Sequence, residues 1–558
     1  MPQSKNMSPI VLTIAGTDSS GGAGIQADLK TFAAHGCYGA SVVAALTAQN
    51  TTGVQDVLPV PAAFVQKQMD SVFDDLEVKA IKTGMLFDAS ITKGVVESLK
   101  TRFTDKGVAQ PPLICDPVCV STSGHTLLQE HALEEMTSGL FPLATLITPN
   151  KSEAELLLKY SGTTMEITSL EDMLTSAEKL LSLGSKAVLV KGGHLESTMD
   201  DVTRIWEAHP EIRAIKQGLF DDNMEILLVG HPKYRTGPLV VDVLFSQGGE
   251  KVVLTRPKIN SSSTHGTGCT LSSAIASELA RGASLTDAVE CATAYTHRGI
   301  LAAEAIGSML TLHLTTIYIP LADYTTRRSS TDPYPFTRML IARTSQIWKQ
   351  YVEHEFVKQL GKGVLNRTNF IYFIKQDYLY LKYYARAYGL LAAKSATFPE
   401  IQSATETILN VLHEIGNHTD YCAKFGISKQ ELESTPEATS TTAYGAYLID
   451  VGLQGDVAKL VMAAMACLLG YGEVGLWLKK ESQRPNSWVV MEGNPYKQWM
   501  DEYSGEMYQN AVRTGLETIE KLAAADPPSL VRFEEWRTVW ERCTRLEKGF
   551  WDAAMNLN

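Results

Sequence analysis

The sequence predicts an α/β domain with a mainly parallel sheet, followed by an all-α domain of bundle type. Up to about residue 320, short apolar runs alternate with helix-like stretches, a pattern typical of a sheet covered by helices on both faces. Beyond that point long helical patterns follow one another and almost no strand signal remains. Because 558 residues exceed the usual size of one compact domain, at least two domains are expected.

The predicted sheet begins with the apolar run at 10–16, which leads through a polar, glycine-rich turn into a helix. Four later apolar runs each end in polar or glycine residues and predict further strands. These runs lie at 78–85, 112–118, 145–150 and 186–194.

Three polar residues stand at the ends of these runs, namely Asp116, Asn150 and Lys191. In open parallel sheets ligands bind beyond the carboxyl ends of the strands. Asp116 could therefore hold Mg²⁺, and Lys191 could meet phosphate oxygens. Taken singly, each is more simply a polar loop residue. The three together, with the glycine-rich turn described next, favour a site.

The stretch 263–270, with the sequence STHGTGCT, runs directly into a helical pattern. Gly266 and Gly268 would let backbone N–H groups converge on an anion at the helix N-terminus, where the helix dipole also favours negative charge. Cys269 lies in the first turn, where we expect a stabilised thiolate that can act as a base. The alternative is a glycine-rich turn with a buried cysteine.

Composition narrows the class of protein. The chain carries 50 basic and 62 acidic residues, a net charge of −12, which argues against nucleic acid and anionic membranes as partners. No apolar run approaches the roughly 20 residues of a membrane span, and the N-terminus does not resemble a signal peptide. The eight cysteines show neither zinc-type spacing nor a disulfide framework, so we expect a reducing, cytoplasmic location.

Two segments interrupt the regular pattern. Residues 200–250 are less regular and predict an insertion, which could be decoration only. Residues 324–335 are polar, contain prolines and lack periodicity, which predicts a linker between halves that work independently.

A second group of candidate residues lies in the helical half. Asp377 and Tyr380 share one helix face, and Cys467 and Tyr471 share another. Further polar candidates occupy helical positions beside apolar residues, and these are Tyr444, Tyr447, Tyr503 and Glu547. Together they could form a pocket for a polar aromatic ring, with Cys467 as the nucleophile. The alternative is an ordinary aromatic core with an inert cysteine.

The first half resembles the hydroxymethylpyrimidine kinase and hydroxymethylpyrimidine-phosphate kinase family of the ribokinase-like superfamily. The resemblance covers about residues 8–322 and rests on GTDSSGGAGIQADLKT, KTGM, DPV, SGHTLL, LITPNKSEAE, VKGGH and STHGTGCTLSSAIA, in that order. It implies two successive phosphorylations of the thiamine pyrimidine that depend on ATP and Mg²⁺. It further implies an anion hole at Gly266 and Gly268, with Cys269 as the base.

The same resemblance assigns the remaining residues of this half. Those implied to contact the pyrimidine are Asp28, Gln49, Met85 and Val118. Those implied at the metal and phosphate end are Asp116, Asn150, Glu153 and Lys191.

The second half resembles the thiaminase II family over about residues 341–556, through FIKQDYLYL, ACLLGYGEVG, YKQWMDEYSG and LEKGFW. The resemblance implies that Cys467 is the nucleophile, that Asp377 binds the aminopyrimidine, and that Glu547 is the acid/base. It places Tyr380, Tyr471 and Tyr503 in the pocket and leaves the choice between Tyr444 and Tyr447 open. With a linker at 323–340, the chain looks like the fungal bifunctional proteins of thiamine biosynthesis.

One departure keeps a second function open. Where the kinase family usually has a glycine-rich segment ending in Gly-Pro-Leu/Ile-Asn-His, residues 306–313 read IGSMLTLH, which could weaken ATP binding. The alternative is a degenerate paralogue that binds pyrimidine or thiamine as a sensor or assembly subunit. A sugar kinase of the wider superfamily is disfavoured by the cysteine at position 269. Both families imply small-molecule substrates and a symmetric homo-oligomer.

Overall fold

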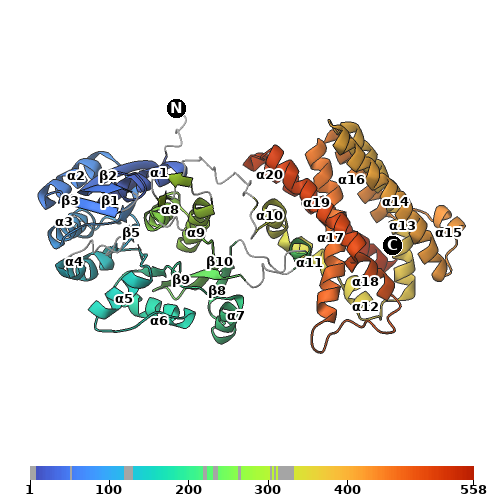
Figure 1. Cartoon of the computed structure of the whole chain (residues 1–558), viewed down its shortest axis with the longest axis horizontal. Coiled ribbons are helices and arrows are strands. Elements are labelled where there is room, and N and C mark those ends of the chain that lie inside the picture. Colours follow the sequence, from blue (N-terminus) through green and yellow to red (C-terminus); the bar gives the residue numbers. More distant parts are fainter. Residues whose placement is uncertain are drawn as a thin grey trace. The chain divides into compact units, whose positions relative to one another are not determined.

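The structure, a computed structural model, divides the chain into two compact units, a sheet unit and a helical unit (Figure 1). The sheet unit comprises Met1–Leu219 and Arg235–Leu321, and the helical unit comprises Phe220–Tyr234 and Ala322–Asn558. The residues that the structure describes are 8–50, 53–118, 130–217, 223–229, 237–261, 265–301, 304–306, 309–311, 328 and 332–558.

The sheet unit is built on ten described strands in the order β3-β2-β1-β4-β5-β6-β7-β9-β10-β8. The pairs from β2 to β7 are parallel, whereas β3 and β9 run antiparallel to their neighbours. All five predicted strands are confirmed as β1, β4, β5, β6 and β7. The strand bounds are β1 Ile10–Gly16, β2 Tyr38–Asn50, β3 Gly53–Pro59, β4 Val78–Thr83, β5 Leu113–Cys115, β6 Leu146–Ile147, β7 Ala187–Val190, β8 Arg213–Lys216, β9 Leu239–Ser246 and β10 Lys251–Pro257.

Helices cover both faces of this sheet, as the alternating pattern predicts. Leu12 and Ile14 of β1 point to the face covered by α2–α7, and Val11 points to the face covered by α1, α8 and α9. Figure 1 shows α8 beside α9. The bounds are α1 Gly24–Ala34, α2 Ala62–Asp75, α3 Ala89–Leu99, α4 Glu130–Glu135, α5 Lys151–Tyr160, α6 Leu170–Leu181, α7 Met199–Ala208, α8 Thr267–Ala280 and α9 Leu285–Leu301.

The expected insertion at 200–250 needs correction. Most of this range forms α7, β8 and β9, which belong to the sheet unit. The pattern was misleading because β8 is only four residues long and buries a single side chain, Ile215. The part assigned to the helical unit is Phe220–Tyr234, of which 223–229 are described and carry the short 3₁₀ helix η4 (Glu225–Leu228).

The helical unit contains only helices among its named elements, which confirms the predicted all-α half. Its core is one large cluster of aliphatic and aromatic side chains. Its helices are α10 Pro335–Arg343, α11 Ser345–Val352, α12 Glu355–Gly361, α13 Arg367–Lys394, α14 Phe398–Lys424, α15 Lys429–Ser434, α16 Thr439–Gln454, α17 Val457–Ser482, α18 Lys497–Ser504, α19 Glu506–Ala525 and α20 Leu530–Asn556.

The C-terminal part of the expected linker is not a linker. Helix α10 begins at Pro335, and its first N–H groups, of Phe336 and Thr337, donate to the buried carboxylate of Glu520 on α19. A proline at the first helical position costs no hydrogen bond, so the proline that suggests a linker also starts a helix.

Helix α17 is, among the described helices, the one long and apolar enough to cross a membrane. Most of its apolar stretch is buried within the helical unit. It is therefore a core helix of the bundle.

Candidate functional site

The predicted anion turn lies at the start of α8. Gly266 adopts a left-handed conformation with φ 82°, and a Cβ there would meet the carbonyl oxygen of Gly22 at 1.9 Å. Only glycine fits that position, because a side chain would be both strained and blocked. A Cβ on Gly268 would lie 3.3 Å from Asp116 Oδ2 and 3.4 Å from Lys191 Nζ. The structure thus brings the turn together with two residues predicted at strand ends.

Asp116 and Lys191 form an ion pair of 3.1 Å, and Lys191 Nζ lies 3.8 Å from Glu153 Oε2. Asn150 caps α5, and its own backbone N–H donates to Glu153, so these two residues hold each other. Burial lowers the pKa of Lys191, but its acidic neighbours outweigh it and raise that pKa above its ordinary value. A lysine held charged beside a helix N-terminus can receive phosphate oxygens.

Cys269 differs from the expectation of a stabilised thiolate. Burial raises the pKa of its thiol to about 11, although the Lys82 ammonium pulls it down. Desolvation therefore outweighs the helix N-terminus, and the resting group is a neutral thiol. Proton acceptance at Cys269 depends on the charges around it, of which Lys82 has the largest favourable effect.

Lys82 is a fully buried residue of β4 that sequence reasoning missed. Its ammonium donates to both carboxylate oxygens of Asp28, at 2.9 and 2.8 Å. Asp28 also accepts from the hydroxyls of Thr13 and Ser273. In the structure Asp28 therefore pairs with Lys82, and its contact with the pyrimidine stays a prediction. Strand β4 reads VKAIKT, and the signal available was that Lys82, unlike Lys79, directly follows the apolar pair Ala80-Ile81. A buried charge at that position requires a partner.

The other residues predicted to touch the pyrimidine lie at or just beyond the ends of strands at the same edge of the sheet. Gln49 is the last residue but one of β2, Met85 follows β4, and Val118 follows β5. Gln49 Nε2 lies 3.5 Å from the ring Nε2 of His265 in the anion turn. A Cβ on Gly16, at the end of β1, would meet Met85 Cε at 2.5 Å.

Asp18 and His265 are a further pair that sequence reasoning missed. Asp18 Oδ2 lies 3.0 Å from His265 Nε2 and also accepts the N–H of Ala23. Burial opposes ionisation of Asp18, but hydrogen bonds from His265 and Ser20 hold its pKa at about 2. The pair connects the anion turn to the loop before α1, so it fixes the position of one glycine-rich segment relative to the other.

The helical unit brings the second predicted group together. Asp377 and Tyr380 come from α13, Cys467 and Tyr471 from α17, and Glu547 from α20. Burial raises the pKa of Cys467 well above its usual value, and the Glu547 and Asp377 carboxyls beside it raise it further. Tyr503 of α18 packs on Tyr471, with ring centres 5.0 Å apart.

Several polar atoms of this pocket are buried without a hydrogen-bond partner of standard geometry in the described part of the chain. They are Glu547 Oε1 and the hydroxyls of Tyr351, Tyr380 and Tyr444. Burial raises the pKa of Glu547 to about 8, opposed in part by the Tyr444 hydroxyl and the Cys467 thiol. Unsatisfied donors and acceptors around a thiol are what a polar ring would engage.

The structure distinguishes the two tyrosines of α16. Tyr444 is fully buried and stacks on Tyr380 at 4.6 Å. Tyr447 instead lies under the guanidinium of Arg542, 5.1 Å from its ring centre. Of the two, Tyr444 is therefore the one that lies with the other predicted pocket residues. Tyr351 of α11 also lines this group and was missed, because nothing in its local sequence marks it.

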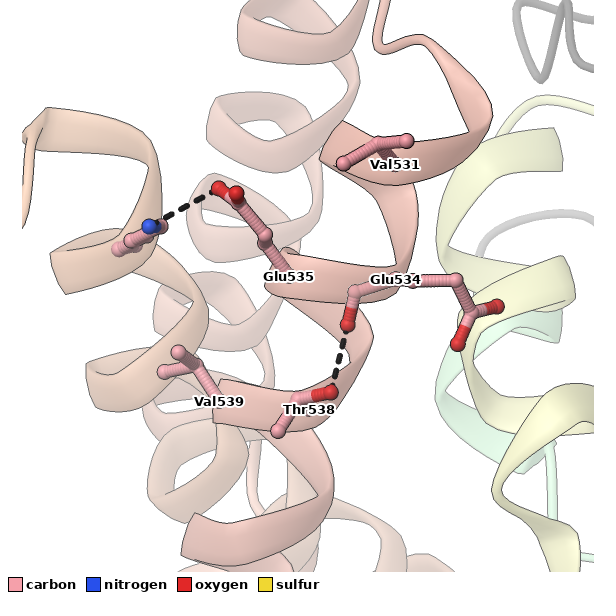
Figure 2. A pocket seen from close by; sticks show the side chains of 6 residues that line it. Val531, Glu534, Glu535, Thr538 and Val539 are labelled. Atoms are coloured by element: carbon pink, nitrogen blue, oxygen red, sulfur yellow. Dashed lines mark hydrogen bonds and ion pairs between the residues drawn. The ribbon is translucent and has the colours of Figure 1, made fainter.

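A separate hollow of about 730 Å³ opens along α20, with Lys459, Val531, Glu534, Glu535, Thr538 and Val539 around it (Figure 2). Lys459 pairs with Glu535 across it at 2.9 Å. Its lining contains no cysteine and no phenol, and none of the predicted site residues lies in it, so it is not the candidate site.

Comparisons with known proteins match each half of the chain to a family. The phosphomethylpyrimidine kinase family matches in two overlapping pieces, residues 18–225 and 207–312. The TENA/THI-4/PQQC family matches residues 341–557.

Relatives of similar length carry both halves. A Schizosaccharomyces pombe protein named hydroxymethylpyrimidine/phosphomethylpyrimidine kinase 2 is 36% identical over 98% of this chain and 91% of its own length. A hydroxymethylpyrimidine/phosphomethylpyrimidine kinase of Saccharomyces cerevisiae is 31% identical over 98% of this chain and 95% of its own. The kinase of that name in Rhizobium meliloti is 41% identical and covers 54% of this chain with 93% of its own length.

Proposed function

The chain belongs to the phosphomethylpyrimidine kinase family with a TENA/THI-4/PQQC half, and from that membership we propose a bifunctional enzyme of thiamine biosynthesis and salvage. The sheet unit would phosphorylate hydroxymethylpyrimidine and then its monophosphate. The helical unit would hydrolyse thiamine or an aminomethylpyrimidine derived from it.

The observation that carries the kinase assignment is the meeting of Gly268, Asp116 and Lys191 at the start of α8. ATP would place its transferring phosphate against the N–H groups of that turn, with Lys191 on its oxygens. Asp116 and Glu153 are oxygen ligands that suit Mg²⁺ held mainly by phosphates, and the ion would neutralise the phosphate charge. Cys269, once its own proton has been lost and it is a thiolate, would take the proton of the substrate hydroxyl as the new P–O bond forms and the bond from that phosphate to ADP breaks.

The intact Cys269 and Lys191 favour an active kinase over the degenerate paralogue. Parts of the altered segment 306–313 are described as a hairpin of β11 (Glu304–Ile306) and β12 (Met309–Thr311), and residues 307–308 and 312–313 lie outside the described residues. We retain ATP and Mg²⁺ as cofactors on the strength of the site at α8.

In the helical unit the Cys467 sulfur would add to the pyrimidine carbon next to the one that bears the methylene arm. Glu547 would take the thiol proton and later return it to the leaving amine. Asp377 would hold the ring nitrogens and stabilise the charge that develops there. Water would then add to the methylene carbon, the sulfur would leave, and the pyrimidine alcohol would be released.

The proposed function also carries expectations for the location, the partners and the assembly of the protein. We expect a cytoplasmic enzyme that acts on small molecules, binds neither nucleic acid nor membrane, and assembles as a closed homo-oligomer. The seven described cysteines are free thiols, consistent with a reducing compartment.

One experiment tests both assignments. The full-length protein is given ATP, Mg²⁺ and hydroxymethylpyrimidine, and separately an aminomethylpyrimidine or thiamine, and the products are followed by mass spectrometry. Cys269→Ser should lower phosphorylation about 10²–10⁴-fold and leave hydrolysis intact. Cys467→Ala should abolish hydrolysis and leave phosphorylation intact, so each variant is the control for the other. Wild-type rates in either variant would contradict the corresponding site.

A further inference from the structure

The helical unit contains a short stretch that lies, in the sequence, between two strands of the sheet unit. Residues 223–229 follow β8 and precede β9, yet they are grouped with the helical unit. Met224, Ile226 and Leu227 are at most 1% exposed and belong to the core of that unit. An extra surface loop would not place three apolar side chains there.

Backbone hydrogen bonds hold this stretch in one register. The buried carboxylate of Glu473 on α17 accepts the N–H groups of Glu225 and Ile226, at 3.0 and 2.9 Å. The indole N–H of Trp348 on α11 donates to the carbonyl of Asn223 at 2.7 Å. Asn223 has φ 63°, a left-handed conformation that asparagine tolerates better than most residues.

The two residues that bind the stretch lie on helices that also carry pocket side chains, Glu473 on α17 and Trp348 on α11. Glu473 lies two positions after Tyr471 on α17. A Cβ on Gly472 would sit 3.5 Å from Ile226 Cγ2, so the stretch packs against that turn of α17.

The stretch is also linked to the pocket through side chains of α11. Trp348 packs edge-on against Tyr351, and Tyr351 in turn packs edge-on against Tyr471. A Cβ on Gly470 would meet the Tyr351 ring at 2.0 Å, so that ring rests directly on the α17 backbone between Cys467 and Tyr471. The stretch therefore supports both helices whose side chains close the pocket beneath Cys467.

Removal of the stretch would change the electrostatics of this region. Burial already raises the pKa of Glu473 to about 8, although the N–H groups of Ile226 and Glu225 oppose it. Without those two N–H donors, the carboxyl group of Glu473 would need hydrogen bonds from water or from other groups. Water admitted there would also reach the Tyr351 side of the pocket, where Glu547 is kept dry.

We propose that residues 223–229 form a docking segment that sets the working geometry of the hydrolase pocket, with Glu473 and Trp348 as the positioning residues that bind it. The proposal rests on the hydrolase function proposed above. It also means that a fragment beginning near residue 338 lacks part of its own core, contrary to the expectation of two independent halves.

The test uses the full-length chain. In one variant residues 220–234 are replaced by a glycine-serine linker of equal length, and in another Trp348→Phe removes the indole donor together with part of the buried ring. Glu225→Gln is the matched control, because it loses the ion pair with Lys480 but keeps the backbone N–H that Glu473 binds. Phosphorylation of hydroxymethylpyrimidine serves as the internal standard for each preparation.

We expect the linker variant to lose at least tenfold in hydrolytic kcat, and Trp348→Phe to lose less, while phosphorylation stays within twofold. The pH midpoint of hydrolytic kcat/KM should also move below about 8, since water then reaches Glu547. Hydrogen exchange should rise in α11 and around residues 470–473. Glu225→Gln should match the wild type.

Three results would overturn the proposal. Unchanged hydrolysis and exchange in the linker variant would show that the segment is decoration. A lower rate with an unmoved pH midpoint would show a role in stability alone. Unchanged hydrogen exchange at residues 470–473 in the linker variant would show that the segment does not dock on α17. If the wild-type chain hydrolyses none of the substrates, the proposed hydrolase function is refuted instead. The hydrogen-exchange measurement would still show whether residues 223–229 dock on α11 and α17.

Discussion

The buried pair of Lys82 and Asp28 offers a sharp test of how the kinase site is held. Lys82→Met keeps most of the length of the side chain but removes the ammonium. It leaves a carboxylate at 0% exposure with, among the described residues, the hydroxyls of Thr13 and Ser273 as its remaining donors. Removing one partner of a buried pair typically costs about 3–5 kcal/mol. Because the two hydroxyls remain, we expect a loss near the lower end of that range.

Calorimetry of the full-length chain measures this loss. A domain of this size shifts by roughly 2 °C per kcal/mol, so the transition of the sheet unit should fall by about 6 °C while that of the helical unit stays. The double variant Lys82→Met with Asp28→Asn removes both charges and should recover more than half of the loss. Phosphorylation should fall in the single variant as well, because Lys82 is the charge that draws down the pKa of Cys269.

Two results would refute this reasoning. A Lys82→Met protein that melts within 1 °C of the wild type would mean that the pair contributes no stability. A double variant no better than the single one would mean that the cost lies in packing and not in an uncompensated carboxylate.

Two further predictions concern the helical unit. Tyr444→Phe should lower hydrolytic kcat/KM about tenfold or more, because its hydroxyl lies beside Glu547, whereas Tyr447→Phe should change it less than twofold; equal effects of the two would contradict the pocket assignment. Burial raises the pKa of Glu547 above its unfolded value, so its ionised, proton-accepting form is lost as the pH falls below about 8. Hydrolytic kcat/KM should therefore rise with pH up to about 8 and then level off, and a flat profile between pH 6 and 8 would show that Glu547 is not the base.

Much of the sheet unit could be predicted because its strands are apolar runs that end in chemically distinctive residues. Strands β1, β4, β5, β6 and β7 follow from that pattern, and so does the position of Asp116 and Lys191 at one edge. The pattern fails at β8, where only Ile215 is buried and the run carries little apolar signal. It therefore hides the fact that the surrounding region continues the sheet.

Parts of the sites depend on contacts that no local pattern contains. Tyr444 and Tyr447 are three positions apart on one helix and so differ by only about 60° around its axis, which leaves both facing the same neighbours. Packing against Tyr380 decides between them. Cys269 was predicted to be acidic from its helix position, but burial, which depends on the whole fold, raises its pKa instead.

The interleaved order of the two units along the chain has a consequence for synthesis. Met224, Ile226 and Leu227 leave the ribosome about 250 residues before Glu473, the group that binds the backbone of this stretch. At about 5–20 residues per second this leaves three core side chains without their helices for roughly 12–50 s. During that interval the strands on either side can already pair, so the nascent chain carries an apolar loop that attracts chaperones. The last step in building the protein is then the closure of the newly made bundle around a segment that was translated long before it.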